Sequence, residues 1–117
     1  MEPLPDRCVP CEGGVKPLTQ DEAAARLELV PEWTCSGEPA RLRRSFRLED
    51  FRRALAWINR VGMLAEEEGH HPDFHLTGWN RVELVLWTHA IGGLSDNDFV
   101  LARKIDALAR RARPRIR

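Results

Sequence analysis

The chain has 117 residues, 43% of them hydrophobic and 31% charged, which suits one compact domain that buries a modest core without disulfide bonds. Its 18 basic and 18 acidic residues cancel, so the net charge offers no attraction for a polyanion, and nucleic acid is not an expected partner. No apolar run approaches the roughly 20 residues that span a bilayer, and the N-terminus lacks the basic-then-apolar order of a signal peptide, so we expect a cytoplasmic protein that does not enter a membrane.

Residues 1–18 hold four prolines and two adjacent glycines, a composition that predicts an irregular N-terminal arm. Within the arm, Cys8 and Cys11 have the Cys-x-x-Cys spacing of half a zinc site. No second pair exists, and Cys35 with a distant histidine would have to complete the site, so we do not favour structural zinc. Three cysteines, an odd number, also fit a reducing compartment.

A first helix is expected near residues 20–30, because Thr19 to Glu22 has the capping-box spacing and Pro31 closes the run that follows. Residues 33–35 predict a short strand. After a Gly-Glu-Pro turn signal, apolar and polar residues alternate from Leu42 to Leu48 with one lapse at Arg44, which predicts the second strand of a hairpin.

From Glu49 the apolar period becomes helical and continues to about Glu68, after which Gly69 is suited to end the helix. One line along this helix contains Phe51, Leu55, Ile58, Gly62 and Glu66, with Ala54, Val61 and Ala65 beside it. We therefore expect this line to face the core, with Glu66 pointing toward the sheet and the two glutamates that follow it turned toward solvent.

Beyond His71-Pro72, residues 74–79 and 82–89 predict a second hairpin that turns near residues 78–81. Ser95 can cap a last helix, and the apolar stripe of that helix contains Leu101, Ala102, Ile105, Leu108, Ala109 and Ala112. The predicted class is α+β, a four-stranded antiparallel sheet with three helices packed on it in the order α-β-β-α-β-β-α. This domain is expected to span residues 19–112, followed by a solvated basic tail at residues 113–117.

All four histidines, at positions 70, 71, 75 and 89, lie within one window of the chain. Histidine exchanges protons near neutral pH, its unperturbed pKa being roughly 6.5, and a helix C-terminus favours the protonated ring. The antiparallel return of the second hairpin can bring His89 back toward His70 and His71. We therefore predict that these three histidines and Glu66 form one acid/base site, whereas a structural role is the simpler interpretation of His75.

A metal site is the main alternative, since the histidines, Glu66 and Asp73 include the ligand types of a hydrolytic zinc or iron centre. The spacing argues against it, because adjacent histidines on an extended chain point to opposite faces and no His-Glu-x-x-His motif is present. We predict a site without metal or cofactor.

Three segments resemble the signature of the pterin-4a-carbinolamine dehydratases. They are EEEGHHPD at residues 66–73, WNRV at residues 79–82, and TH-x-x-x-GLS-x-x-D from residue 88 to residue 98. The resemblance implies an enzyme that removes water from a 4a-hydroxytetrahydropterin, the product of an aromatic amino acid hydroxylase, to give the quinonoid dihydropterin without metal or organic cofactor.

The resemblance also assigns roles to individual residues. It implies three catalytic histidines, of which His70 and His89 are the acid/base pair and His71 helps to hold the pterin. The substrate-binding residues that it implies are Glu66, Pro72, Asp73 and Thr88, and the supporting residues are Trp79 and Asp98. Two departures are visible: residues 75–78 are one residue longer than in the animal form, and Trp79 stands where tyrosine is usual.

The resemblance further implies a pterin substrate, a homodimer or homotetramer joined through sheet edges and helices, and an aromatic amino acid hydroxylase in the same pathway. An unprotected edge strand is a physical motive for such pairing. The alternative function is a partner-binding or assembly protein on the same fold that keeps a vestigial pterin pocket.

Overall fold

The computed structural model describes residues 4–10 and 15–112 of the chain. Its elements in chain order are α1 (Gln20–Leu27), β1 (Thr34–Ser36), β2 (Arg41–Arg47), α2 (Phe51–Glu68), β3 (Asp73–Thr77), β4 (Arg81–Leu86), a 3-10 turn (His89–Ile91) and α3 (Asp96–Ala112). The predicted α+β class and the order α-β-β-α-β-β-α are therefore confirmed. None of the described helices is long and apolar enough to cross a membrane.

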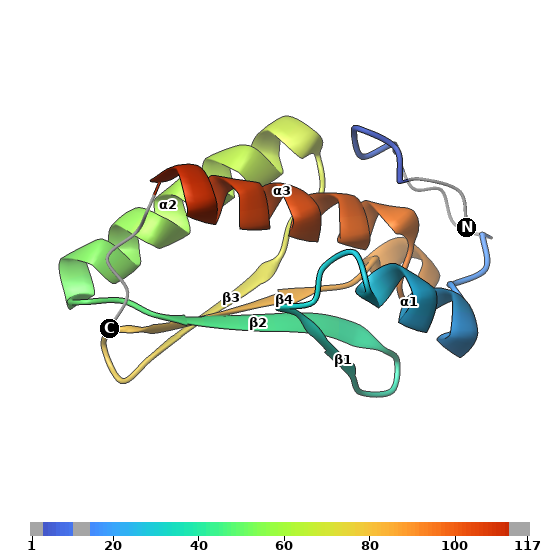
Figure 1. Cartoon of the computed structure of the whole chain (residues 1–117), viewed down its shortest axis with the longest axis horizontal. Coiled ribbons are helices and arrows are strands. Elements are labelled where there is room, and N and C mark those ends of the chain that lie inside the picture. Colours follow the sequence, from blue (N-terminus) through green and yellow to red (C-terminus); the bar gives the residue numbers. More distant parts are fainter. Residues whose placement is uncertain (1–3, 11–14, 113–117) are drawn as a thin grey trace.

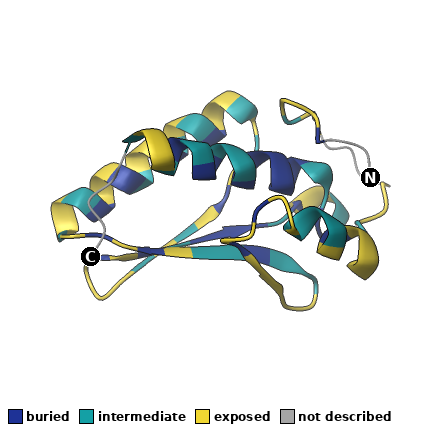
Figure 2. Ribbon diagram, in the orientation of Figure 1, coloured by how far each residue is buried: buried dark blue, intermediate teal, exposed yellow. Residues whose placement is uncertain are grey.

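The four strands form one antiparallel sheet in the order β1-β2-β4-β3. The β3–β4 hairpin thus places β4 in the interior of the sheet, where it pairs with β2 on its other side. Helices α2 and α3 lie side by side on one face of the sheet, and no helix of the described residues covers the opposite face (Figure 1). Burial follows this arrangement, because the dark, buried segments line the space between the helices and the sheet (Figure 2).

Local signals set the ends of the helices as the sequence predicts. Thr19 Oγ1 accepts a hydrogen bond from the Glu22 N–H at 3.1 Å, and Glu22 Oε1 accepts one from the Thr19 N–H at 2.8 Å, which completes the capping box. Helix α1 ends at Leu27, short of the predicted residue 30. Gly69 ends α2 in the left-handed conformation, with φ of 66°.

The face of α2 that packs on the core is rotated from the line predicted to face inward, toward the alanines and Val61 beside it. Its buried residues are Ala54, Trp57, Val61 and Ala65. The predicted inward line is largely outside the core: Phe51 is 50% exposed, Leu55 is 43% exposed, and the Glu66 side chain is 80% exposed. The expectation for the acidic run is wrong for Glu68, whose side chain is only 5% exposed, whereas Glu67 is exposed as expected. Two apolar lines run along this helix, and the line containing alanines faces inward because small residues let the helix approach the sheet closely.

The lapse in alternation at Arg44 has a structural cause. Arg44 shares the inward face of β2 with Leu42 and Phe46, and its Nη1–H donates to Asp106 Oδ1 on α3 at 2.5 Å. The same oxygen accepts the indole N–H of the buried Trp33 at 2.8 Å. A single carboxylate therefore accepts from one buried and one half-buried donor and connects α3 to the sheet.

The N-terminal arm has no helix or strand in its described residues, but it is docked on the helices. Leu4 is 8% exposed and belongs to the core. The Pro5 carbonyl accepts from Arg103 Nη2–H at 2.7 Å, and the Cys8 N–H donates to Glu68 Oε1 at 3.0 Å. The Leu18 N–H donates to the Leu94 carbonyl at 2.8 Å. The boundary at residue 18 stays a prediction, and the basic tail at 113–117 lies outside the described residues.

Asp106→Ala should lower the free energy of unfolding by about 2–4 kcal/mol, because it leaves the Trp33 N–H and the Arg44 guanidinium without their buried acceptor. Urea denaturation measures the change. Glu83→Ala is the control, since the Arg43–Glu83 pair is 3.6 Å apart with side chains 35% and 31% exposed, and its loss should cost less than about 1 kcal/mol. Equal losses in the two variants would contradict the importance of the Asp106 network.

Candidate active site

A hollow of about 380 Å³ lies where β4 ends and β3 begins, beside the end of α2 and the start of α3. Its lining residues are Val9, Gly69, His70, His71, Pro72, Asp73, Trp87, Thr88, His89, Ala90 and Asn97. The structure thus brings together six of the predicted site residues, including all three predicted catalytic histidines. His75 does not line the hollow and lies on β3 with an exposed side chain.

His70 is held by a buried carboxylate. Its Nε2 lies 2.6 Å from Asp98 Oδ1, and the side chains of the two residues are 10% and 0% exposed. The other carboxylate oxygen, Oδ2, accepts from Thr88 Oγ1–H at 2.8 Å and from the Ser95 N–H at 2.9 Å. With these partners Asp98 has a fixed orientation, so it fixes the His70 ring and can balance a positive charge on it.

His71 and Glu66 form a second, more exposed pair at the rim. His71 Nε2 lies 2.8 Å from Glu66 Oε1, and their side chains are 63% and 80% exposed. Glu66 therefore reaches the site by a different route from the one predicted, since it approaches over the surface rather than from the core. It contacts the site through His71 and does not line the hollow itself.

His89 is not on a strand, contrary to the prediction that the last strand continues to residue 89. Strand β4 ends at Leu86, and His89 opens the 3-10 turn that Gly92 closes with φ of 66°. The strand ends because the chain folds back on itself, with Thr88 forming an isolated bridge to Gly93. The His89 ring packs against Trp87 with their centroids 4.0 Å apart, so it faces the hollow from the side of β4.

The polar groups behind the hollow are neutral or paired. Burial raises the pKa of the Cys8 thiol to about 12, and the nearby negative charge of Glu68 adds to the effect. Burial would also raise the pKa of the Glu68 carboxyl, but hydrogen bonds from Lys104 and the Cys8 N–H outweigh it and hold the pKa below its usual value. Cys8 is therefore a protonated thiol at neutral pH and a poor metal ligand or nucleophile.

Across the described ranges, no group of three His, Cys, Asp or Glu side chains is arranged to hold a metal ion. Cys11 lies outside those ranges, so the expectation of a site without zinc stays a prediction.

Sequence reasoning missed Val9, Trp87 and Asn97 as lining residues. Trp87 carried a signal, since it is an aromatic residue two positions before a site histidine. Asn97 carried a weaker one, an amide side chain beside Asp98 in the first turn of α3. Val9 carried none, because only tertiary contacts bring the arm to the hollow.

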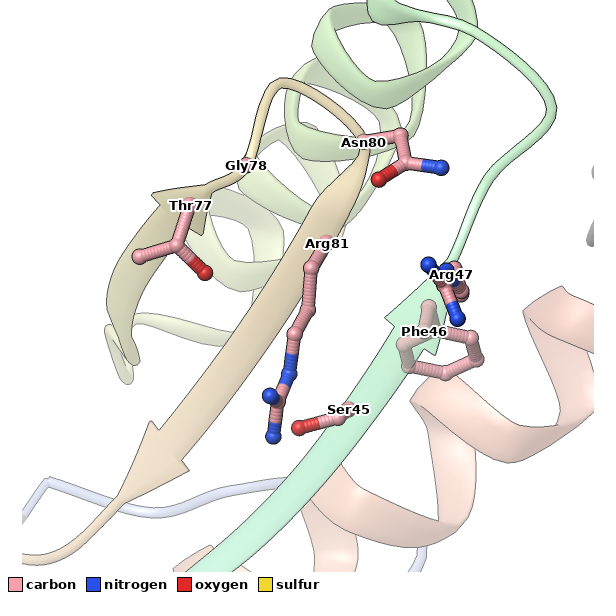
Figure 3. Close-up of a pocket in the computed structure, with 7 residues that line it drawn as sticks. All are labelled: Ser45, Phe46, Arg47, Thr77, Gly78, Asn80 and Arg81. Atoms are coloured by element: carbon pink, nitrogen blue, oxygen red, sulfur yellow. The ribbon is translucent and has the colours of Figure 1, made fainter.

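A second hollow, of about 530 Å³, lies at the opposite end of the sheet. It is lined by Ser45, Phe46, Arg47, Thr77, Gly78, Asn80 and Arg81 (Figure 3). Trp79 belongs to the β3–β4 turn at this end, with φ of 63° and an exposed fraction of 53%. Trp79 does not line the histidine hollow. Its supporting role therefore stays a prediction, and it can concern only the β3–β4 turn.

The fold and the site together define a small α+β protein with three histidines lining one hollow, one of them held by a buried carboxylate. The sequence model of the pterin 4 alpha carbinolamine dehydratase family matches residues 16–108. The chain belongs to this family, as the resemblance implied.

Similar proteins agree with this assignment. A Rubrobacter xylanophilus protein, provisionally named a pterin-4-alpha-carbinolamine dehydratase, is 50% identical over 86% of this chain and 92% of its own. The mitochondrial pterin-4-alpha-carbinolamine dehydratase 2 of Arabidopsis thaliana is 45% identical over 87% of this chain and 56% of its own.

Two solved structures share the fold. A transcriptional coactivator/pterin dehydratase from Brucella melitensis is 31% identical, with a TM-score of 0.72, over 80% of this chain and 99% of its own. A pterin dehydratase-like protein identified as a RuBisCO assembly factor in the alpha-carboxysome is 25% identical, with a TM-score of 0.56, over 67% of this chain and 89% of its own.

Proposed function

We propose that this chain dehydrates a 4a-hydroxytetrahydropterin to the quinonoid dihydropterin by acid/base catalysis with His70 and His89. The observation that carries the proposal is the pairing of His70 with the buried Asp98 in a hollow that His89 also lines. Family membership supplies the substrate class.

The reaction needs one proton delivered to the departing 4a-hydroxyl and one removed from ring nitrogen N5, and it involves no change of oxidation state. His70 is suited to accept the N5 proton, because the Asp98 carboxylate balances the charge that forms on its ring. His89 then supplies the proton with which the hydroxyl leaves as water. Each proton transfer typically contributes on the order of 100- to 10,000-fold to the rate.

The remaining site residues hold the substrate. His71, oriented by Glu66, together with Pro72 and Asp73, forms the side of the hollow next to β3. The Thr88 hydroxyl lies 2.7 Å from Ser95 Oγ and donates to Asp98, so Thr88 acts through the carboxylate rather than by binding the pterin. The proposed physiological role is recycling of the pterin that an aromatic amino acid hydroxylase releases, with no metal or organic cofactor.

His89→Ala should lower kcat for the carbinolamine by about 100- to 10,000-fold without changing the melting temperature, because His89 is exposed and removes no core contact. A hydroxylase generates the carbinolamine, and the absorbance of the quinonoid product reports the rate. His75→Ala is the control, since it removes an exposed histidine that does not line the hollow, and it should retain wild-type activity. A folded wild-type protein that gives no acceleration over buffer would refute the proposed function.

We also propose that the chain forms a homo-oligomer, with the second apolar line of α2 as one interface. This line contains Phe51, Leu55 and Ile58, and the two large hydrophobic residues Phe51 and Leu55 are about half exposed. A Cβ at Gly62 would meet nothing within 4 Å, so this stretch of the helix is open to a close partner. Strand β3 is a sheet edge that can pair with a second copy, which gives a dimer through the sheet and a tetramer through α2.

Leu55→Glu should shift the protein to a smaller species in size-exclusion chromatography with light scattering, because it buries a charge in the α2 interface. Leu29→Glu is a matched control, since Leu29 is 44% exposed and Leu55 is 43% exposed, but Leu29 lies beyond the end of α1. A monomeric wild type, or the same shift in both variants, would contradict this interface.

A partner-binding or assembly role is the second candidate function, and the likeness to the RuBisCO assembly factor favours it. On this proposal the pterin hollow is vestigial and an exposed face binds another protein. Affinity purification from the native cell should then recover a stoichiometric partner, and the purified chain should be inactive toward the carbinolamine. An active chain that purifies without a partner argues for the enzyme.

A further inference from the structure

The first described segment of the N-terminal arm, residues 4–10, lies beside the histidine hollow but precedes residue 16, where the match to the family begins. The arm has no regular secondary structure, so its position depends on specific contacts. The side chain of Asn97 supplies two of them: its Oδ1 accepts from the Val9 N–H at 2.9 Å, and its Nδ2–H donates to the Val9 carbonyl at 2.6 Å. Asn97 is 5% exposed, so this bond pair is sheltered from water.

Neighbouring contacts hold the arm on both sides of Val9. The Cys8 N–H donates to Glu68 Oε1, and the same carboxylate is paired with Lys104 Nζ at 2.6 Å. Asn97 directly precedes Asp98, the residue that holds His70. One turn of α3 therefore fixes both the proposed catalytic ring and the backbone of Val9.

The backbone of Val9 is fixed by hydrogen bonds, whereas much of the residue is exposed to solvent. Both backbone polar groups are bonded, yet Val9 is 60% exposed and is one of the residues that line the hollow. Single exposed apolar side chains are common on protein surfaces. Val9 differs because the buried amide of Asn97 holds its backbone beside a proposed binding site. Covering the Val9 side chain with an apolar part of a ligand would be favourable.

We infer that Val9 is a specificity-determining residue, whose isopropyl group contacts the bound pterin and limits the size of the substituent on the ring. This inference rests on the proposed dehydratase function. The arm thus contributes to the lining of the hollow, together with Pro72 and the histidines, from chain outside the family match. Val9 takes no part in proton transfer, so its substitution should affect KM and substrate choice rather than kcat.

The test compares two carbinolamines, one with a methyl group and one with a dihydroxypropyl chain at ring carbon 6. Val9→Ala should raise KM about three- to ten-fold with kcat within about two-fold of wild type, because two methyl groups leave the binding surface. Val9→Phe should lower kcat/KM at least about ten-fold more for the long substituent than for the methyl group. Val15→Ala is the matched control, since Val15 is 56% exposed in the same arm and does not line the hollow.

A second measurement reports on the arm without turnover. Trypsin should cleave after the exposed Arg7 faster in Asn97→Ala than in wild type, and 7,8-dihydrobiopterin should slow the cleavage of wild type by covering Val9. If wild type is active and both Val9 variants match Val15→Ala in KM and substrate choice, the inference about the arm is wrong and the proposed function stands. If wild type is inactive and binds no dihydropterin, the proposed function fails, and the inference fails with it.

Discussion

The carboxylate of Asp98 is the contact on which the histidine site depends. It is fully buried, and a buried charge is stable only when its oxygens are bonded. Its partners come from three segments: the ring of His70 after α2, the hydroxyl of Thr88 after β4, and the backbone N–H of Ser95 before α3. Because the buried Asp98 carboxylate needs all of these partners, the segments after α2, after β4 and before α3 must meet around it. The hollow is the space that remains between these segments.

The sequence was sufficient for features set by local chemistry. The capping box at Thr19, the left-handed Gly69 and the strand alternation depend on neighbours in the chain, and the structure has all of them. The grouping of His70 with His89 follows instead from the antiparallel hairpin between them. The hydrophobic periodicity of α2 does not show which of its two apolar lines faces the core, because both lines have the same helical spacing. That single error reversed the expected positions of Glu66 and Glu68.

Other features depended on partners far away in the chain. Arg44 interrupts an apolar face because Asp106 on α3 accepts its hydrogen bond, and no local pattern shows that pairing. Strand β4 stops before His89 because of a fold-back at Thr88 and Gly93. The arm approaches the hollow because the Asn97 side chain bonds both backbone polar groups of Val9, as a neighbouring strand would. The two residues are more than 80 positions apart in the sequence.

The turn of the β3–β4 hairpin is far from the histidine site. The turn, with positive φ at Gly78 and Trp79, lies at the far end of the strands from the histidines. Register near the site is set by pairs such as Asp73 with Val85, and those pairs do not involve the turn. Loop tips accept insertions more readily than paired strands do. A residue inserted at the turn can therefore be absorbed there, so the hairpin can change length while His70 and His89 keep their separation in space.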